Sequence, residues 1–296
     1  MKIYDCCMFF DEEMLLGLRL KTLNKYIDKF IIVESKYTHS GDKKKLIFNI
    51  NKYSEFKKKI NYIITEDYAE GIENINNDDN ENQKNIKHIM NALRRENYQR
   101  NKIKDGLNEA TSDDWIIISD LDEIPNLDKI NFNEINKKII FFKQRVFYYK
   151  LNLELKKIHW IGSKAVRKKN LISPQWLRNI KDRIYSKWRL DIIFSKKKYN
   201  NIFYINDGGW HFSYIKKPED IEKKLKSYLH HREYDLKPLG IEKIKNFVNN
   251  KSVIYDHRLD QTQYKFSGSQ KLEKISLDYL PPDIENNINF YKEWLD

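Results

Sequence analysis

Short apolar runs recur through the first third of the chain and are separated by polar, turn-forming stretches. Residues 2–4, 30–33, 60–64 and 115–118 each predict a short strand. Between the first two strands, leucines at helical spacing predict an amphipathic helix over residues 11–23, with its first residue, an aspartate, as a possible N-cap. Strand–helix–strand order of this kind indicates an α/β fold built on a mostly parallel central sheet.

The later parts of the chain continue this mixed pattern. Residues 73–91 are rich in Asn and Asp and poor in apolar side chains, which predicts a mobile surface insertion. A helix is predicted over residues 92–110, strands within 139–155 and at 158–162, and another helix over 218–231. Since no flexible linker interrupts these elements, we expect a single domain over the whole chain with a C-terminal helical cap.

Two aspartates follow directly after the most apolar predicted strand. Trp115 to Ile118 leads into Ser119-Asp-Leu-Asp-Glu-Ile-Pro, so Asp120 and Asp122 come at the strand's end and Pro125 stops its continuation. Open α/β sheets place their ligands at this carboxyl edge. Carboxylates this close repel each other unless a cation lies between them, and a hard divalent cation is the usual solution. The alternative is a solvated acidic turn.

Other polar residues are predicted to face the same edge. Glu34, Thr38, His39 and Gly41 follow the strand at 30–33 and are candidates for binding the same ligand. The alternative is that each is an ordinary loop residue that caps or turns the chain.

The helix predicted over residues 92–110 carries charge on its apolar stripe. Glu96 and Arg100 share the stripe with leucine and isoleucine, and buried charges need partners. We therefore expect Arg100 to reach an anion at the sheet edge, with Asn97 and Asn101 beside it. An internal Glu96–Arg100 ion pair at i,i+4 spacing is the alternative, and the two are compatible.

The composition is that of a folded protein, and it excludes some classes. The 296 residues include 40% hydrophobic and 14% aromatic side chains, without an apolar run long enough to cross a membrane. The start of the chain lacks the apolar core of a signal peptide. The two cysteines are adjacent and form no disulfide framework, so we expect a reducing, cytoplasmic location.

The net charge of +12 is concentrated in one segment. Residues 137–198 hold 19 lysines and arginines against three acids. Such a segment can attract anionic ligands, lipid head groups at a membrane surface, or nucleic acid, and a merely solvated basic face is the alternative.

Five short motifs, in order, resemble glycosyltransferase family 17. The resemblance extends from the first strand to about residue 264. Its motifs are Cys6 to Phe10, Phe30 to Ser35 followed by Thr38 and Gly41, Arg95 to Asn101, Ile116 to Pro125, and Gly209 to Ser213.

This resemblance implies a single GT-A-like, Rossmann-like glycosyltransferase domain over residues 1–296. Residues 1–127 would form the nucleotide-sugar-binding half, and residues 128–296 the acceptor-side half. It further implies a UDP-sugar donor, most simply UDP-GlcNAc, a protein- or lipid-linked glycan acceptor, a divalent cation, and inversion at the anomeric carbon. The membrane anchor of the Golgi members is absent from these residues.

The resemblance also implies roles for residues of the second half. His211, between paired glycines and the basic Lys216-Lys217-Pro218, would join Asp120 and Asp122 as a metal ligand, although a lone histidine is more often structural. A histidine among oxygen ligands favours Mn²⁺ over Mg²⁺. Arg100 and a lysine near 216–226, such as Lys217, would bind the donor's phosphates.

An inverting transfer also needs a base for the acceptor hydroxyl. Asp207 is the first candidate, with Glu233 and Asp260 as others, and a plain turn residue before Gly208 is the alternative for Asp207. Aromatic side chains could stack on sugar faces or simply fill the core; these are Tyr148, Trp160 and Trp176.

Two other classes of function stay open at this point. A nucleic-acid-binding protein could use the basic segment, but it would leave Asp120 and Asp122 unexplained, so we expect no nucleic-acid partner. A metal-dependent nucleotide-sugar hydrolase or nucleotidyltransferase could use the same two carboxylates.

Overall fold

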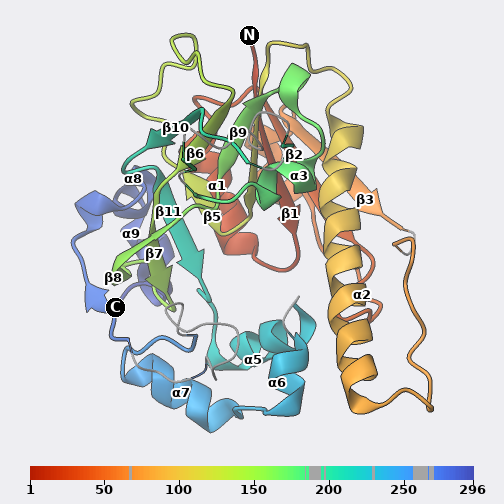
Figure 1. Ribbon diagram of the computed structural model, residues 1–296. Helices are drawn as coiled ribbons and strands as arrows, with labels where there is room; N and C mark the ends of the chain where they lie inside the picture. The colour runs from red at the N-terminus through yellow and green to blue at the C-terminus, as the bar shows by residue number, and fades with distance from the viewer. Residues whose placement is uncertain are drawn as a thin grey trace.

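The computed structural model describes residues 1–66, 69–183, 185–186, 195–196, 198–228, 231–255, 266 and 270–296. It is a mixed α/β fold with two sheets (Figure 1). The larger sheet has seven strands in the order β10-β6-β9-β4-β1-β2-β3. These strands are β1 (Ile3–Phe9), β2 (Lys29–Ser35), β3 (Ile60–Thr65), β4 (Trp115–Asp120), β6 (Ile139–Phe142), β9 (Lys164–Arg167) and β10 (Ile202–Ile205).

The pairing within this sheet confirms the predicted fold class. The four strands β3, β2, β1 and β4 pair in parallel, as do β10 and β6, and only β9 runs antiparallel to its neighbours. A parallel sheet is covered on both faces and its strands are therefore continuously apolar. This explains why Trp115 to Ile118 shows no alternation with polar residues: all four are fully buried.

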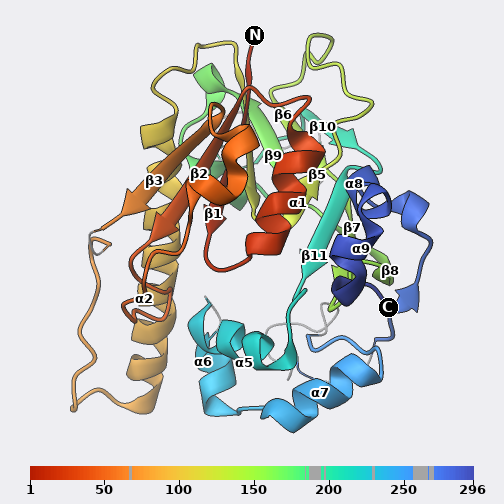
Figure 2. The same cartoon turned by 180° about the vertical axis from the view of Figure 1, so that it is seen from behind.

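Helices cover both faces of the large sheet (Figures 1 and 2). Alternate residues of β4 point to opposite faces. Trp115 and Ile117 pack with the leucines of α1 (Glu13–Leu23), whereas Ile116 and Ile118 pack on the side of α3 (Pro174–Asn179) and the short 3₁₀ helix η2 (Lys102–Gly106). The long helix α2 (Glu81–Asn101) precedes η2 and lies along the same side.

The smaller sheet lies against the end of β4. Its order is β12-β8-β7-β11-β5, from β5 (Glu123–Pro125), β7 (Gln144–Tyr148), β8 (Leu153–Trp160), β11 (Gly209–Ser213) and β12 (Glu273–Lys274). Because β5 starts one residue after Asp122 and pairs antiparallel with β11, His211 lies directly opposite Glu123. This register brings the histidine beside the two aspartates.

The remaining helices lie around the smaller sheet and below the parallel strands in Figure 1. Helices α5 and α6 lie beyond the carboxyl ends of the parallel strands, and α8 contacts α1. These helices are α5 (Pro218–Ser227), α6 (His231–Leu236), α7 (Ile241–Asn249), α8 (Pro282–Asn286) and α9 (Ile288–Tyr291). Besides η2, the 3₁₀ turns are η1 (Ile50–Phe56) between β2 and β3, η3 (Lys168–Asn170) after β9, and η4 (Leu277–Tyr279) and η5 (Lys292–Trp294) near the C-terminus.

Three helix boundaries differ from the prediction. Helix α2 begins at Glu81, inside the stretch predicted to be an insertion, because Asn80 and Gln83 form a reciprocal capping box. It ends at Asn101, where the tighter turn η2 begins. Helix α5 ends at Ser227, before the predicted end at 231.

The predicted N-cap of α1 was also wrong. Glu12 holds the N-cap position, without a capping side-chain bond, while Asp11 forms an ion pair with Lys216.

Within the described residues, no helix is both long enough and apolar enough to span a bilayer.

Candidate active site

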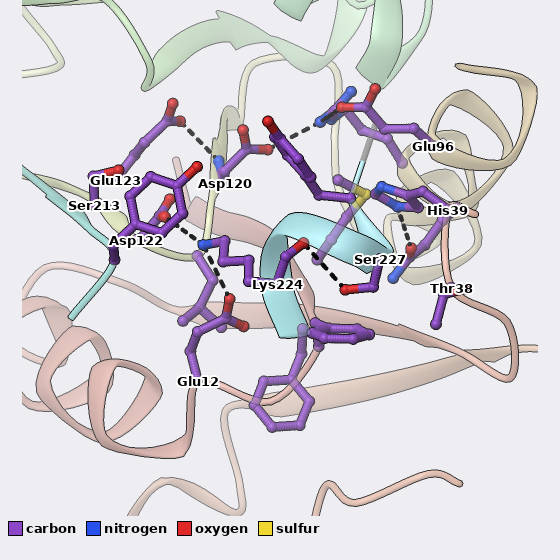
Figure 3. A pocket seen from close by; sticks show the side chains of 18 of the residues that line it. Glu12, Thr38, His39, Glu96, Asp120, Asp122, Glu123, Ser213, Lys224 and Ser227 are labelled. Carbon is purple, nitrogen blue, oxygen red and sulfur yellow. Dashed lines mark hydrogen bonds and ion pairs between the residues drawn. The ribbon is translucent and has the colours of Figure 1, made fainter. Parts of the chain in front are cut away.

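A pocket of about 610 Å³ opens at the carboxyl ends of β1, β2 and β4 (Figure 3). Its lining comes from the loops after these strands, from the C-terminal half of α2, from β11 and from the C-terminal half of α5. The polar side chains that line it include Glu12, Thr38, His39, Glu96, Arg100, Asp120, Asp122, Glu123, His211, Ser213 and Lys224. The residues after β2 and β4 were predicted to face one ligand site, and Thr38, His39, Asp120 and Asp122 do line the same pocket.

The turn between Asp120 and Glu123 is held from inside the core by Arg19. This arginine is fully buried on α1 and donates to both carboxylate oxygens of Asp5, at 2.7 and 2.6 Å. Its Nη1 also donates to the carbonyl oxygens of Asp120, Leu121 and Glu123, at 3.2, 3.3 and 2.7 Å. A single side chain thus satisfies three carbonyls of the turn that carries Asp122.

Both carboxylate oxygens of Asp120 are bound by arginines. Arg100 Nη2 donates to Oδ1 at 2.9 Å and Arg178 Nη2 donates to Oδ2 at 2.8 Å. Burial opposes the charge on Asp120, but Arg178 and Arg100 outweigh it and hold the pKa of this carboxyl well below its usual range. Arg100 also pairs with Glu96 at 2.7 Å, which confirms the predicted i,i+4 ion pair, while its contact with the donor stays a prediction.

Glu123 forms the floor of the turn. Its buried carboxylate accepts hydrogen bonds from Arg178 at 2.7 Å, from Trp160 Nε1 at 2.6 Å and from the backbone N–H of Asp120 at 2.8 Å. Gly162 lies so close to this carboxylate that any side chain there would collide with it. Glu123 therefore stabilises the turn by binding its backbone and by linking it to Arg178 and Trp160.

Asp122 lies between a histidine and a lysine. Its Oδ1 is 3.9 Å from His211 Nε2, too far for a hydrogen bond, and its Oδ2 accepts from Lys224 Nζ at 3.2 Å. The His211 ring stacks on Trp160, with 5.0 Å between centroids and 28° between planes. His211 Nδ1 is buried and has no hydrogen-bond partner among the residues that the structure describes.

Lys224 connects Asp122 to a second carboxylate, that of Glu12, at 3.4 Å. Burial lowers the pKa of Lys224, but Asp122 and Glu12 more than compensate and raise it well above its usual range. Burial in turn opposes the charge on Glu12, yet Lys224 and Lys216 lower its pKa to about 2. The Lys224 ammonium and the Glu12 carboxylate are therefore both charged at neutral pH.

Asp122 and His211 fit two ligands of one divalent cation. Ligands bound to such a cation at about 2.1–2.2 Å lie roughly 3–4 Å apart, as these two do, with His211 Nε2 3.9 Å from Asp122 Oδ1. Across the described residues, however, no three His, Cys, Asp or Glu side chains form a group that could hold a metal ion. Asp120 differs from the other two because arginines bind both its oxygens. The three-ligand metal site stays a prediction.

The predicted donor-binding residues after β2 divide into two groups. Thr38 and His39 line the pocket. His39 Nε2 contacts Gln99 Oε1 at 3.2 Å, and burial lowers the pKa of this histidine. Glu34 does not line it, because its buried carboxylate binds Lys44, Tyr62 and the backbone N–H groups of residues 47 and 48. Gly41, with a φ of 113°, makes room for the guanidinium of Arg95.

Other predicted residues lie outside the pocket. Asn101 accepts a hydrogen bond from the backbone of Gln175, and Lys217 pairs with Glu293 on the surface. Asp207 is an exposed turn residue with a φ of 51°, as the alternative interpretation expected. Glu233 lies on α6 and is not part of the lining, and Asp260 is outside the described residues.

Two arginines of the site were missed by the sequence reasoning. Arg19 left a signal, since it is a charged residue between two leucines of a predicted amphipathic helix. Arg178 shows no such signal in the sequence, because it lies 58 positions from Asp120 and is one of many basic residues in the segment 137–198.

Part of that segment's charge is paired in the fold. Arg145 binds Glu154 with two hydrogen bonds of 2.7 Å, and Lys169 pairs with Asp113 at 2.6 Å. Of the three aromatic candidates, Tyr148 and Trp160 line the pocket, whereas Trp176 does not.

The sequence was compared with known proteins and protein families. None of the curated proteins compared with the chain matches it. The family model of glycosyltransferase family 17 matches residues 1–275, which covers every described residue of the pocket. The chain therefore belongs to glycosyltransferase family 17, and the protein is a glycosyltransferase.

Proposed function

We propose that this glycosyltransferase moves a sugar, most simply GlcNAc, from a UDP-sugar to a glycan hydroxyl with inversion of the anomeric configuration and with a divalent cation. The supporting observation is the arrangement of Asp122, His211 and Lys224 in one pocket at the carboxyl edge of the sheet. Two potential metal ligands beside a buried cation suit a diphosphate better than a neutral ligand.

The pocket's two ends suit the two parts of a nucleotide sugar. Thr38 and His39, at the end of β2, line the end that would take the nucleotide, as ligands bind outside the carboxyl ends of α/β strands. Aromatic rings of Tyr148, Trp160 and Tyr214, which lie on or directly after strands of the smaller sheet, also line the pocket. Flat aromatic faces suit the apolar faces of sugar rings.

Asp122 and His211 would hold Mn²⁺ or Mg²⁺, which, when bound, would supply Lewis-acid stabilisation of the charge on the leaving UDP. Arg100 and Lys224 would add positive charge from the chain itself. Asp120 would act by keeping Arg100 and Arg178 in place.

An inverting transfer is a single displacement in which the acceptor hydroxyl attacks the face opposite the leaving UDP. A carboxylate takes its proton. The carboxylates that line the pocket are each paired with a cation: Glu12 and Asp122 with Lys224, Glu96 with Arg100, and Asp120 and Glu123 with Arg178. Asp207, Glu233 and Asp260 stay the predicted candidates for the base.

The test begins with binding and ends with product. Purified protein with Mn²⁺ is screened against UDP-sugars by thermal shift, and donors that stabilise it are offered with glycan and lipid-linked acceptors. We expect stabilisation by UDP-GlcNAc and a β-linked product, identified by NMR. The proposal fails if no nucleotide sugar binds. UDP-sugar hydrolysis that no acceptor suppresses would instead favour a hydrolase, and transfer of the nucleotide would favour a nucleotidyltransferase.

A further inference from the structure

Lys224 occupies a position between two carboxylates of the pocket (Figure 3). Its ammonium lies 3.2 Å from Asp122 Oδ2 and 3.4 Å from Glu12 Oε1, and it also lies 5.6 Å from the centre of the Tyr214 ring. The three charged side chains are mostly buried, with exposed fractions of 21% for Lys224, 13% for Asp122 and 10% for Glu12. Water therefore screens their interactions only partly.

The Asp122 carboxylate is within reach of both Lys224 and a divalent cation at His211. Asp122 faces Lys224 with Oδ2 and His211 with Oδ1, so a divalent cation held by Asp122 and His211 would lie close to the ammonium. Like charges at such distances in a mostly buried site repel strongly. Lysine is a point charge on a flexible stem of four carbons and can turn to another partner.

A charge count points to that other partner. Two carboxylates and one ammonium carry one net negative charge, and a divalent cation alone would change it to one net positive charge. The donor's diphosphate, which carries two negative charges in a UDP-sugar, would restore the original balance. The cation and the diphosphate are thus electrostatically favoured together rather than separately.

We propose that Lys224 is an exchangeable counter-ion: it competes with the divalent cation for Asp122 and moves to the donor's diphosphate when cation and donor bind together. The proposal rests on the proposed function and deepens it, because it assigns the diphosphate contact to Lys224 and links metal binding to donor binding.

The test measures binding without turnover. Mn²⁺ affinity is measured from the free-ion EPR signal, and UDP affinity by calorimetry with and without Mn²⁺, for the wild type and for Lys224→Met. In Lys224→Met we expect Mn²⁺ alone to bind more tightly, by about tenfold, and UDP in the presence of Mn²⁺ to bind about tenfold more weakly. A residue that merely stabilised the pocket would weaken both.

Lys226→Met is the matched control. Lys226 lies on the same helix but is half-exposed, pairs with Glu222, and does not line the pocket. Its replacement is expected to leave both affinities unchanged. Unchanged or weaker Mn²⁺ binding by folded Lys224→Met would overturn the proposal.

A measurement on the wild type keeps the proposal testable if Lys224→Met does not fold. Mn²⁺ and UDP should each raise the other's affinity, whereas independent binding would refute the exchange. The outcome is separable from that of the proposed function. If UDP and UDP-sugars do not bind at all, the proposed function fails, while the effect of Lys224 on Mn²⁺ alone is still measured.

Discussion

Arg19 Nη1 lies 2.7 Å from the carbonyl oxygen of Glu123, although the two residues are 104 positions apart. Arg19 is on α1, which packs against the large sheet, whereas Glu123 begins β5 of the smaller sheet. The same guanidinium binds Asp5 on β1, next to the central strand β4. The core of the large sheet is thereby connected directly to the turn that presents Asp122. The geometry of the pocket depends on a buried ion pair that does not itself line the pocket.

Replacing Arg19 by Met should affect both the fold and the pocket. It leaves Asp5 as an unpaired buried charge and frees three carbonyls, so we expect a loss of about 3–5 kcal/mol in the free energy of unfolding. Urea denaturation measures this loss. Arg145→Met is the control, because its pair with Glu154 is more exposed and neither residue lines the pocket; it should cost less and leave UDP binding intact. Equal costs for the two variants would contradict the role assigned to Arg19.

Asp122→Asn should abolish transfer without unfolding the protein. The amide keeps the shape of the side chain but removes the charge that a cation and Lys224 both use, so we expect the transfer rate to fall at least about 10²-fold. Asp128→Asn is the control, because Asp128 is exposed and pairs with Lys25 and Tyr26 at the surface. Wild-type transfer by Asp122→Asn would exclude this carboxylate from the reaction.

Trp160→Phe separates two contacts of one side chain. Phenylalanine can still stack on His211 but cannot donate to Glu123, which loses its 2.6 Å hydrogen bond. We expect a loss of about 1–2 kcal/mol in stability, since the acceptor is a buried carboxylate. Trp160→Leu should in addition weaken Mn²⁺ binding because it removes the stacking partner of His211. Identical Mn²⁺ affinity in the two variants would show that the stack does not position the histidine.

The buried Lys164 predicts an unusual pH dependence of stability. Burial, reinforced by the charge of Arg178, lowers the pKa of this lysine from 10.5 to about 7 in the folded protein. Between these values the unfolded chain binds a proton that the folded protein does not, so this group's contribution to stability rises as the pH rises from about 7 toward 10.5. Below pH 7 the full cost of the buried charge is present.

Comparison with Lys164→Met isolates that contribution. The difference in the free energy of unfolding between wild type and variant should shift in favour of the wild type as the pH increases over this interval. Chemical denaturation at pH 6.5, 8 and 9.5 measures it. Parallel pH profiles for the two proteins would show that Lys164 keeps an ordinary pKa.

Much of the fold and part of the site could be predicted from local sequence. The apolar run from Trp115 to Ile118 predicted a strand buried on both faces, and Asp120 and Asp122 therefore had to lie at its carboxyl edge. The charged residue Arg100 on an apolar helix stripe predicted an anionic partner, which is Asp120. Even the start of α2 was encoded locally, by Asn80 and Gln83, although the low apolar content of the stretch concealed it.

The remaining features depend on contacts between segments distant in the chain. Arg19, Arg178 and Lys224 reach the Asp120–Glu123 turn across 101 to 104, 55 to 58 and 102 positions. No spacing rule connects residues so far apart. The pairing of β5 with β11 places His211 beside Asp122, and this register follows from the packing of a second sheet. The periodicity of apolar residues determined which residues are buried and where strands end, because both depend on the local backbone conformation. Only tertiary packing decided which cation each carboxylate binds.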